Sequence, residues 1–110
     1  MEDWQQRTRI LLGEDKMKRL QQAHVLVVGL GGVGAYAAEM ICRAGVGRMT
    51  IVDADTVQPT NINRQLPALH STIGKEKSAV LAARFKRING IYHKIILRGI
   101  KQFGYIPVFQ

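Results

Sequence analysis

A glycine-rich hexapeptide is the first segment of this sequence whose residue types and spacing suit chemistry. Residues 29–34 read G-L-G-G-V-G and match the pattern G-x-G-x-x-G. Glycine lets the chain turn tightly and lets its backbone come close to a phosphate. A helix that begins at such a turn presents unpaired N–H groups and the positive end of its dipole to the anion. The hexapeptide therefore predicts a nucleotide-binding turn, whose contacts we expect from Gly29, Gly31, Gly32 and Gly34.

Two carboxylates follow the second apolar segment of the chain. Asp53 and Asp55 come directly after residues 49–52, which read M-T-I-V. In dinucleotide-binding folds, an acid at the end of the second strand accepts hydrogen bonds from a ribose. We therefore expect Asp53 to bind a ribose. Asp55 is either a second acid of the same site or a cap for the loop that follows.

A polar loop and a lysine indicate which nucleotide is bound. Residues 60–65 read T-N-I-N-R-Q, and Lys77 lies thirteen residues after Arg64. An NAD-dependent oxidoreductase has no need for this cationic pair. A triphosphate does, because negative charge builds up on its oxygens as pyrophosphate leaves. The loop therefore favours ATP over NAD, with phosphate contacts expected from Asn61, Asn63, Arg64, Gln65 and Lys77.

These residues need a scaffold of strands and helices to bring them together. Residues 24–29 and 49–52 are predicted to be buried parallel strands, because they are short apolar runs bounded by turn residues. Residues 14–22 and 75–88 are predicted to be helices. The order of strand, helix, strand, loop and helix begins an α/β fold with a Rossmann-like parallel sheet.

The helix between the two strands is predicted to bury one apolar face. Its large and small apolar residues recur at helical spacing, and Gly45 is a suitable C-terminal end. Cys42 lies near this face and is interpreted as a core residue, since it has no recognisable catalytic histidine. The positions assigned to the buried face are Val33, Tyr36, Ala37, Met40, Ile41 and Ala44.

The chain divides by composition into three segments. Residues 1–22 are predicted to form a helical arm, residues 23–89 a Rossmann-like ATP-binding unit, and residues 90–110 a basic and apolar tail. Apolar clusters at 95–97 and 105–109 in this tail are candidates for further strands.

The net charge of +8 favours phosphate-bearing partners. One cysteine, the start of the sequence and the lack of a long apolar run indicate a cytoplasmic protein without a membrane partner.

The ordered set of motifs resembles a known enzyme family. Besides the turn and the acidic pair, it includes Arg7 ahead of L-L-G at 11–13, R-A-G-V-G at 43–47, N-I-N-R-Q at 61–65 and G-K-E-K at 74–77. Over residues 7–89 the chain resembles the adenylating family of ubiquitin-activating enzymes and the bacterial proteins ThiF, MoeB and HesA. Together with A-L-H-S at 68–71, the N-I-N-R-Q motif looks most like the tRNA threonylcarbamoyladenosine dehydratases, or TcdA-like proteins.

The resemblance implies an activity, cofactors and partners. Members of this family use ATP and Mg²⁺ to adenylate a carboxylate, with release of pyrophosphate. In TcdA-like enzymes the carboxylate belongs to a modified adenosine of tRNA, which is then cyclised by loss of water. In the sulfur-carrier activators it is the C-terminal glycine of a small protein. The resemblance thus implies tRNA as the acceptor, with a sulfur carrier or sulfurtransferase as the alternative partner.

The resemblance also implies a homodimer with a shared site. Arg7 matches the arginine that family dimers place in the partner's site, so the expected catalytic residues are Arg7, Arg64 and Lys77. Arg9 is an alternative match, and an exposed chain terminus explains Arg7 equally well.

After residue 89 the sequence departs from the family pattern. Gly90 stands where the family continues with proline and a third strand, and the magnesium-binding aspartate of the family lies beyond this chain. We therefore expect a truncated or frame-shifted form with impaired activity, or else a deliberately short variant. The alternative function is a nucleotide-binding or dimerising fragment without turnover.

Overall fold

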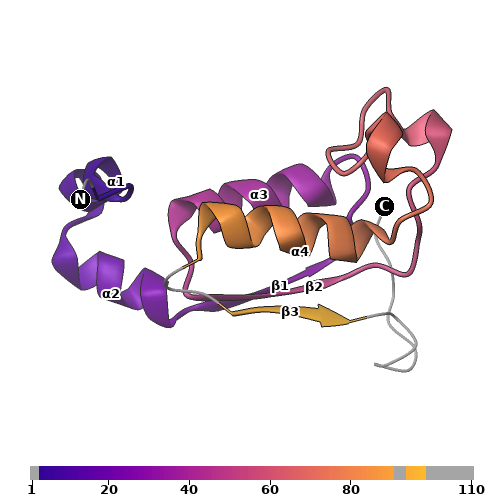
Figure 1. Ribbon diagram of the computed structural model, residues 1–110. Helices are drawn as coiled ribbons and strands as arrows, with labels where there is room; N and C mark the ends of the chain where they lie inside the picture. The colour runs from indigo at the N-terminus through magenta and orange to yellow at the C-terminus, as the bar shows by residue number, and fades with distance from the viewer. Residues whose placement is uncertain (1–2, 91–93, 99–110) are drawn as a thin grey trace.

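A small parallel β-sheet lies along one side of the molecule, below the two long helices (Figure 1). The computed structural model describes residues 3–90 and 94–98. Strands β1 (His24–Val28), β2 (Arg48–Val52) and β3 (Lys94–Arg98) pair in this order, and both pairs are parallel. This arrangement confirms the predicted Rossmann-like sheet. Its strand order corresponds to the 3-2-1 half of the 3-2-1-4-5-6 order found in dinucleotide-binding folds.

Two helices connect the strands and lie on the same face of the sheet (Figure 1). Helix α3 (Gly34–Ala44) follows β1, and helix α4 (Lys77–Ile88) follows β2 after a long loop. The core lies between these helices and the sheet, where the burial of apolar surface stabilises the fold. Its fully buried members include Leu30, Ala35, Ala38, Cys42, Met49, Ile51, Leu81 and Phe85.

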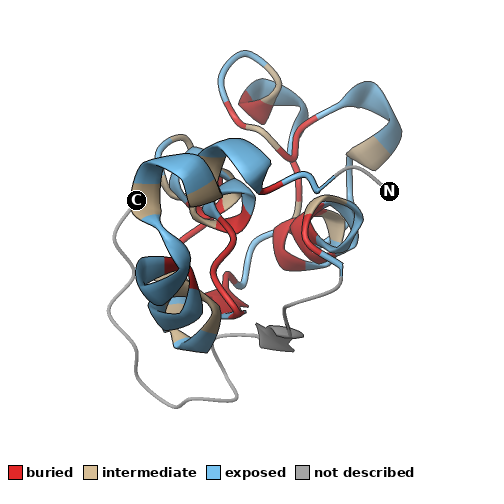
Figure 2. Cartoon of the chain, turned by 90° about the vertical axis from the view of Figure 1, so that its left-hand side faces the viewer, coloured by how far each residue is buried: buried red, intermediate tan, exposed pale blue. Residues whose placement is uncertain are grey.

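The buried face of α3 differs from the predicted one. The residues that α3 buries are Ala35, Ala38 and Cys42, whereas Tyr36 and Met40 are 49% and 64% exposed. Because α3 packs closely on the sheet and beside α4, its inward positions take small side chains, and the large apolar ones point away. Figure 2 shows the resulting mixture of buried and exposed positions on the helices. The prediction from apolar spacing was therefore wrong for Val33, Tyr36, Ala37, Met40 and Ala44, and Ile41 is half-buried.

Cys42 is a core residue, as interpreted from the sequence. It is buried, and its Sγ lies 3.5 Å from the carbonyl oxygen of Phe85 on α4. Burial raises the pKa of the Cys42 thiol to about 11, so the thiol stays protonated at neutral pH. The side-chain amide of Asn89 donates to the carbonyl oxygens of Cys42 and Val46, at 3.2 and 3.0 Å. These bonds join the ends of α3 and α4.

Two short helices form the N-terminal arm. Helix α2 (Glu14–Gln22) confirms the helix predicted there and buries Met17. Helix α1 (Gln6–Leu12) lies within the predicted helical arm but was not predicted as a helix of its own, because its seven residues mix polar and apolar types. It buries none of its own residues, and Ile10 and Leu11 are 77% and 83% exposed. Figure 1 shows α1 lying away from the sheet.

The third strand coincides with one apolar cluster of the tail. Residues 95–97 lie within β3, so that candidate strand is confirmed, whereas the cluster at 105–109 lies outside the described residues. Among the helices of the described part, the longest has twelve residues, and none has the length and hydropathy to cross a bilayer.

Candidate nucleotide site

The glycine-rich turn and Asp53 lie together because two parallel strands end at the same edge of the sheet. Val28 pairs with Val52, so the residues that follow each strand are neighbours. The N–H of Gly29 donates to the carbonyl oxygen of Val52 at 2.8 Å. Gly29 has a φ of 90°, a left-handed conformation that favours glycine. The turn therefore begins at this residue and directs the chain over the end of β2.

Asp53 connects the glycine-rich turn to the loop that follows β2. Its Oδ2 accepts a hydrogen bond from the N–H of Leu30 at 2.6 Å, and its Oδ1 accepts one from the N–H of Asp55 at 2.7 Å. The residue is 8% exposed. Backbone donors thus hold the Asp53 carboxyl group in one orientation, and each oxygen keeps a lone pair for further donors such as ribose hydroxyls.

Helix α3 begins very close to the turn. A Cβ added at Gly34 would overlap the carbonyl oxygen of Gly29, so no larger residue fits without a backbone shift. At Gly32, by contrast, a Cβ would meet no atom within 4 Å. Among the described residues, no hydrogen bond uses the N–H of Gly32 or Val33. These N–H groups at the start of α3 are available to an anion.

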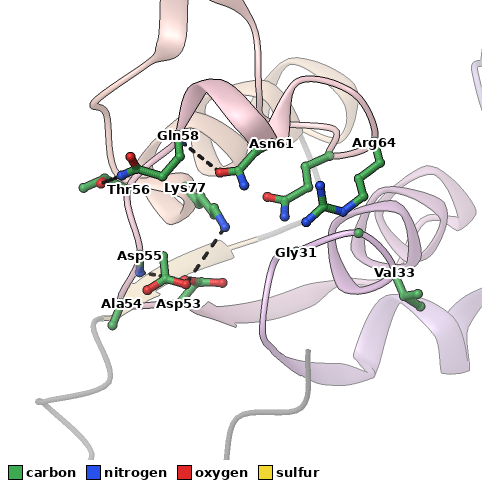
Figure 3. Close-up of a pocket in the computed structure, with 12 residues that line it drawn as sticks. Gly31, Val33, Asp53, Ala54, Asp55, Thr56, Gln58, Asn61, Arg64 and Lys77 are labelled. Atoms are coloured by element: carbon green, nitrogen blue, oxygen red, sulfur yellow. Dashed lines mark hydrogen bonds and ion pairs between the residues drawn. The ribbon is translucent and has the colours of Figure 1, made fainter.

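The loop after β2 folds back over the glycine-rich turn. A 3₁₀ helix, η1 (Pro59–Asn61), is held by the N–H of Gln58, which donates to Asn61 Oδ1 at 2.8 Å. The N–H of Gln65 donates to the carbonyl oxygen of Asn61 at 2.9 Å. Asn61 and Gln65 are both buried, and the Gln65 amide lies against Gly31. Figure 3 shows the Asn61 and Arg64 side chains above the pocket, with Gly31 below them.

Arg64 lies at the mouth of the pocket and is positioned by its neighbour. Its Nη1 donates to Asn63 Oδ1 at 2.8 Å and to the carbonyl oxygen of Thr60 at 3.3 Å. The Arg64 side chain is exposed, and its remaining N–H groups make no hydrogen bond within the described residues. Asn63 does not line the pocket, so it acts on the site through Arg64.

Lys77 brings a cation to the pocket from the first residue of α4. The residue is 5% exposed, and its Nζ lies 4.0 Å from Asp55 Oδ2. The N–H of Lys77 donates to the carbonyl oxygen of Asp55 at 3.1 Å. Asp55 therefore contacts the start of α4 through its carbonyl oxygen and faces the Lys77 ammonium group with its carboxylate (Figure 3). The two interpretations of Asp55, as a second acid of the site and as a cap for the loop, both stay predictions.

One cavity of about 790 Å³ joins these groups, a volume within the range of small-molecule sites. Of the residues expected at the site, it is lined by Gly31, Gly32, Asp53, Asp55, Asn61, Arg64, Gln65 and Lys77. Gly29, Gly34 and Asn63 support the lining residues without joining them. The cavity is also lined by four residues that were not predicted, Val33, Ala54, Thr56 and Gln58. Val33 and Ala54 lie inside the glycine-rich and acidic motifs, and Thr56 and Gln58 lie just before the polar loop, so their positions were a signal.

Arg7 does not line this pocket. It is exposed on α1, whereas the pocket lies beyond the carboxyl ends of the strands, at the opposite end of the molecule (Figure 1). In this structure Arg7 therefore does not reach the pocket of its own chain.

The described residues do not provide a protein-held magnesium site. No group of three or more His, Cys, Asp or Glu side chains in residues 3–90 and 94–98 could hold a metal ion. Of the two pocket carboxylates, Asp53 is held by two backbone N–H groups and Asp55 faces Lys77. Mg²⁺ does not fit this donor set.

Comparison with known proteins identifies relatives over most of the chain. The model of the ThiF family matches residues 5–95, which extends past residue 89, where the resemblance expected from the sequence ends. The chain is 51% identical over 75 residues to a tRNA threonylcarbamoyladenosine dehydratase of Haemophilus influenzae, with 68% of the chain and 29% of that protein covered. It is 39% identical over 75 residues to the molybdopterin-synthase adenylyltransferase of Escherichia coli, with 68% and 30% covered.

Solved structures share the fold. The E. coli tRNA N6-threonylcarbamoyladenosine dehydratase, TcdA, in complex with ATP is 40% identical and has a TM-score of 0.81. The similarity covers 89% of this chain and 41% of that one. The chain spans about a third of the length of the curated relatives it matches.

Proposed function

Because this chain belongs to the ThiF family, we propose that it binds ATP in the pocket at the carboxyl ends of β1 and β2, as part of an adenylating activity. One observation carries the proposal. A single cavity brings together a glycine-rich helix start, a buried and oriented carboxylate, and two cations. These are the groups that a triphosphate, a ribose and a departing pyrophosphate require.

The geometry supports one orientation of the nucleotide. The ribose hydroxyls donate to Asp53, and the phosphates lie between the start of α3 and the side chains of Arg64 and Lys77. A carboxylate oxygen of the substrate attacks the α-phosphorus, the bond to the β-phosphate oxygen breaks, and pyrophosphate leaves with that electron pair. Arg64 and Lys77 stabilise the charge that develops on the leaving oxygens. Asn61 donates a further hydrogen bond to the phosphates.

The acceptor that we propose is the modified adenosine of tRNA, whose activated carboxylate is cyclised by loss of water. The greater identity to a tRNA threonylcarbamoyladenosine dehydratase than to an adenylyltransferase, 51% against 39%, supports this choice. Pyrophosphate release that needs a sulfur-carrier protein in place of tRNA would favour the alternative, a sulfur-carrier adenylyltransferase. ATP binding without any turnover would favour a binding module.

We also propose that the active form is a homodimer. Helix α1 buries none of its residues and exposes Ile10 and Leu11, so it has an apolar surface for a second copy. The exposed side chains of Tyr36 and Met40 on α3 provide a second apolar surface. A dimer through such surfaces gives Arg7 a route to the partner's pocket.

Titration calorimetry tests the nucleotide proposal directly. We expect Arg64→Ala and Lys77→Ala each to weaken ATP binding to the full chain by about 10- to 100-fold, because each removes a charge-assisted contact to phosphate. Lys75→Ala is the matched control, since Lys75 is exposed and lies two residues from Lys77 without lining the pocket. Equal ATP affinity in all four proteins, with folding verified by circular dichroism, would contradict the proposal. Binding of NAD with an affinity equal to that of ATP would contradict it as well.

A further inference from the structure

Three arginines surround a second hollow, far from the nucleotide pocket. The hollow has a volume of about 260 Å³ and is lined by Arg43 of α3 and by Arg84, Arg87 and Ile88 of α4. It lies at the C-terminal ends of the two helices, whereas the pocket lies at their N-terminal ends. Lys77 and Arg87 are ten residues apart on one helix, or about 15 Å along its axis.

Glu39 holds two of these arginines in place. Its carboxylate accepts a hydrogen bond from Arg84 Nε and one from Arg84 Nη2 at 3.3 Å, and it pairs with Arg43 Nε at 3.5 Å. The Glu39 side chain is 13% exposed, against 46% for Arg84 and 51% for Arg43. A largely buried carboxylate thus fixes the inner edges of two guanidinium groups and leaves their outer edges to solvent.

The hollow keeps unused hydrogen-bond donors. Arg84 retains Nη1, Arg43 retains both terminal nitrogens, and Arg87 forms no ion pair within the described residues. Three guanidinium groups against one carboxylate leave a net positive charge of two. A favourable interaction with the helix dipole is enough to explain an arginine in the last turn of a helix. It accounts for Arg43 in the last turn of α3 and for Arg87 in the last turn of α4. It does not explain why Glu39 also holds Arg84 beside them.

We propose that this arginine hollow binds a phosphate of an RNA strand. The tRNA acceptor comes from the proposed function above, and the inference rests on it to that extent. A guanidinium group presents N–H donors in a fixed fork that matches a phosphate, and three of them around one hollow suit a polyanion. An RNA bound here at its backbone extends along α4 to the pocket, where its reacting carboxylate meets ATP.

The chemistry of the hollow favours nucleic acid over an acidic protein. Among the described residues, Ile88 is the one aliphatic residue of its lining, so this part of the hollow offers little of the apolar centre that protein interfaces bury. The net charge of +8 adds a long-range attraction for RNA. Contacts of this kind position a nucleic acid without reading its sequence.

Fluorescence anisotropy with a labelled tRNA transcript tests the inference. We expect Arg43→Gln and Arg87→Gln each to weaken binding to the full chain by about fivefold near 0.1 M salt, and to lower the slope of log affinity against log salt by about one. Arg87→Lys keeps the charge and should recover most of the slope but only part of the affinity. ATP affinity, measured separately by calorimetry, should be unchanged in all three variants, because none of these residues lines the nucleotide pocket.

Lys16→Gln is the matched control, since Lys16 is exposed on α2 and lines neither cavity. An equal loss of tRNA affinity in Lys16→Gln would overturn the inference, because it would indicate a uniform charge effect. Unchanged tRNA binding in the Arg43→Gln and Arg87→Gln variants would also overturn the inference. So would polyglutamate that displaces the labelled tRNA as effectively as unlabelled RNA does at the same concentration of negative charges. If ATP binding failed while the arginine variants still lost RNA binding, the proposed function would fail and the hollow would stand.

Discussion

Asp53 has a structural role beside the ribose-binding role proposed for it. Its sequence position after a strand indicates a ribose ligand, yet both of its oxygens accept backbone N–H groups, from Leu30 and Asp55. A buried donor left without its acceptor costs about 1–3 kcal/mol, so replacement of Asp53 would disturb the turn as well as the ligand contact. Effects of such a variant on ATP binding therefore need a measurement of stability beside them.

Glu39 gives a prediction about pH at the same scale. The hydrogen bonds and charge of Arg84 lower the pKa of Glu39 below its ordinary value of 4.5, despite the opposing effect of burial. A carboxyl whose pKa is lower in the folded state contributes stability above the unfolded pKa, and this stability is lost as the pH falls through the folded pKa. The contribution at pH 7 is about 1 kcal/mol or less, because Arg84 is half-exposed.

We therefore expect Glu39→Gln to lower the urea midpoint at pH 7, and the difference from wild type to shrink as the pH falls below about 4.5. Urea denaturation from pH 3 to pH 7 measures both effects. Glu76→Gln serves as the control, since Glu76 is exposed and forms no ion pair among the described residues. A difference that stays constant across this range would show that the Glu39 charge does not contribute.

At the scale of the element, α3 depends on close contact between its first turn and the end of β1. The two glycines of this region meet different surroundings, since a Cβ at Gly34 would overlap the Gly29 carbonyl and a Cβ at Gly32 would meet nothing within 4 Å. The same G-x-G-x-x-G pattern therefore contains one residue required for packing and one that lines the open pocket.

This contrast predicts opposite outcomes for two alanine substitutions. We expect Gly34→Ala to destabilise the fold by about 3 kcal/mol, since backbone atoms must move to make room. Gly32→Ala should change stability by less than about 1 kcal/mol and weaken ATP binding instead, because Gly32 lines the pocket. Thermal denaturation followed by circular dichroism and calorimetry with ATP give the two readouts. Equal stability of both variants would mean that α3 does not need its close approach to the turn.

At the scale of the whole molecule, the distance between Arg7 and the pocket leads to a test of assembly. If Arg7 acts in the partner's pocket, a heterodimer of Arg7→Ala and Lys77→Ala chains contains one complete site and one that lacks both groups. An equimolar mixture should therefore recover roughly a quarter of the wild-type number of high-affinity ATP sites, as measured by calorimetry. Each variant alone should have none.

A mixture of Arg64→Ala and Lys77→Ala is the matched control. Both residues line the pocket of their own chain, so every site in that mixture lacks one of them. If the control mixture also recovered high-affinity ATP sites, the recovery in the first mixture could not be explained by Arg7 acting in the partner's pocket. No recovery in the first mixture, with dimers detected by sedimentation, would mean that Arg7 is not part of the partner's pocket.

The sequence alone determined the residue types of the site and the order of its elements. The site residues lie in or beside short segments whose conformation can be predicted from the local sequence, because apolar runs predict strands and glycines predict turns. This holds for the glycine pattern, for Asp53 and for the loop with Arg64. These signals correctly placed α2, β1, β2 and α4, and the resemblance that they carry correctly indicated the ThiF family.

The tertiary structure decided what depends on contacts between distant segments. It assigned the buried face of α3 to small residues, because the space between the helix and the sheet is set by all the elements around it. It showed Asp53 bridging two loops and gathered Arg43, Arg84 and Arg87 around one hollow. Residues 43 and 84 are far apart in the chain, and no periodicity along a sequence records that two helix faces meet. Local patterns fix the local conformation, whereas the packing of the whole chain fixes which side chains become neighbours.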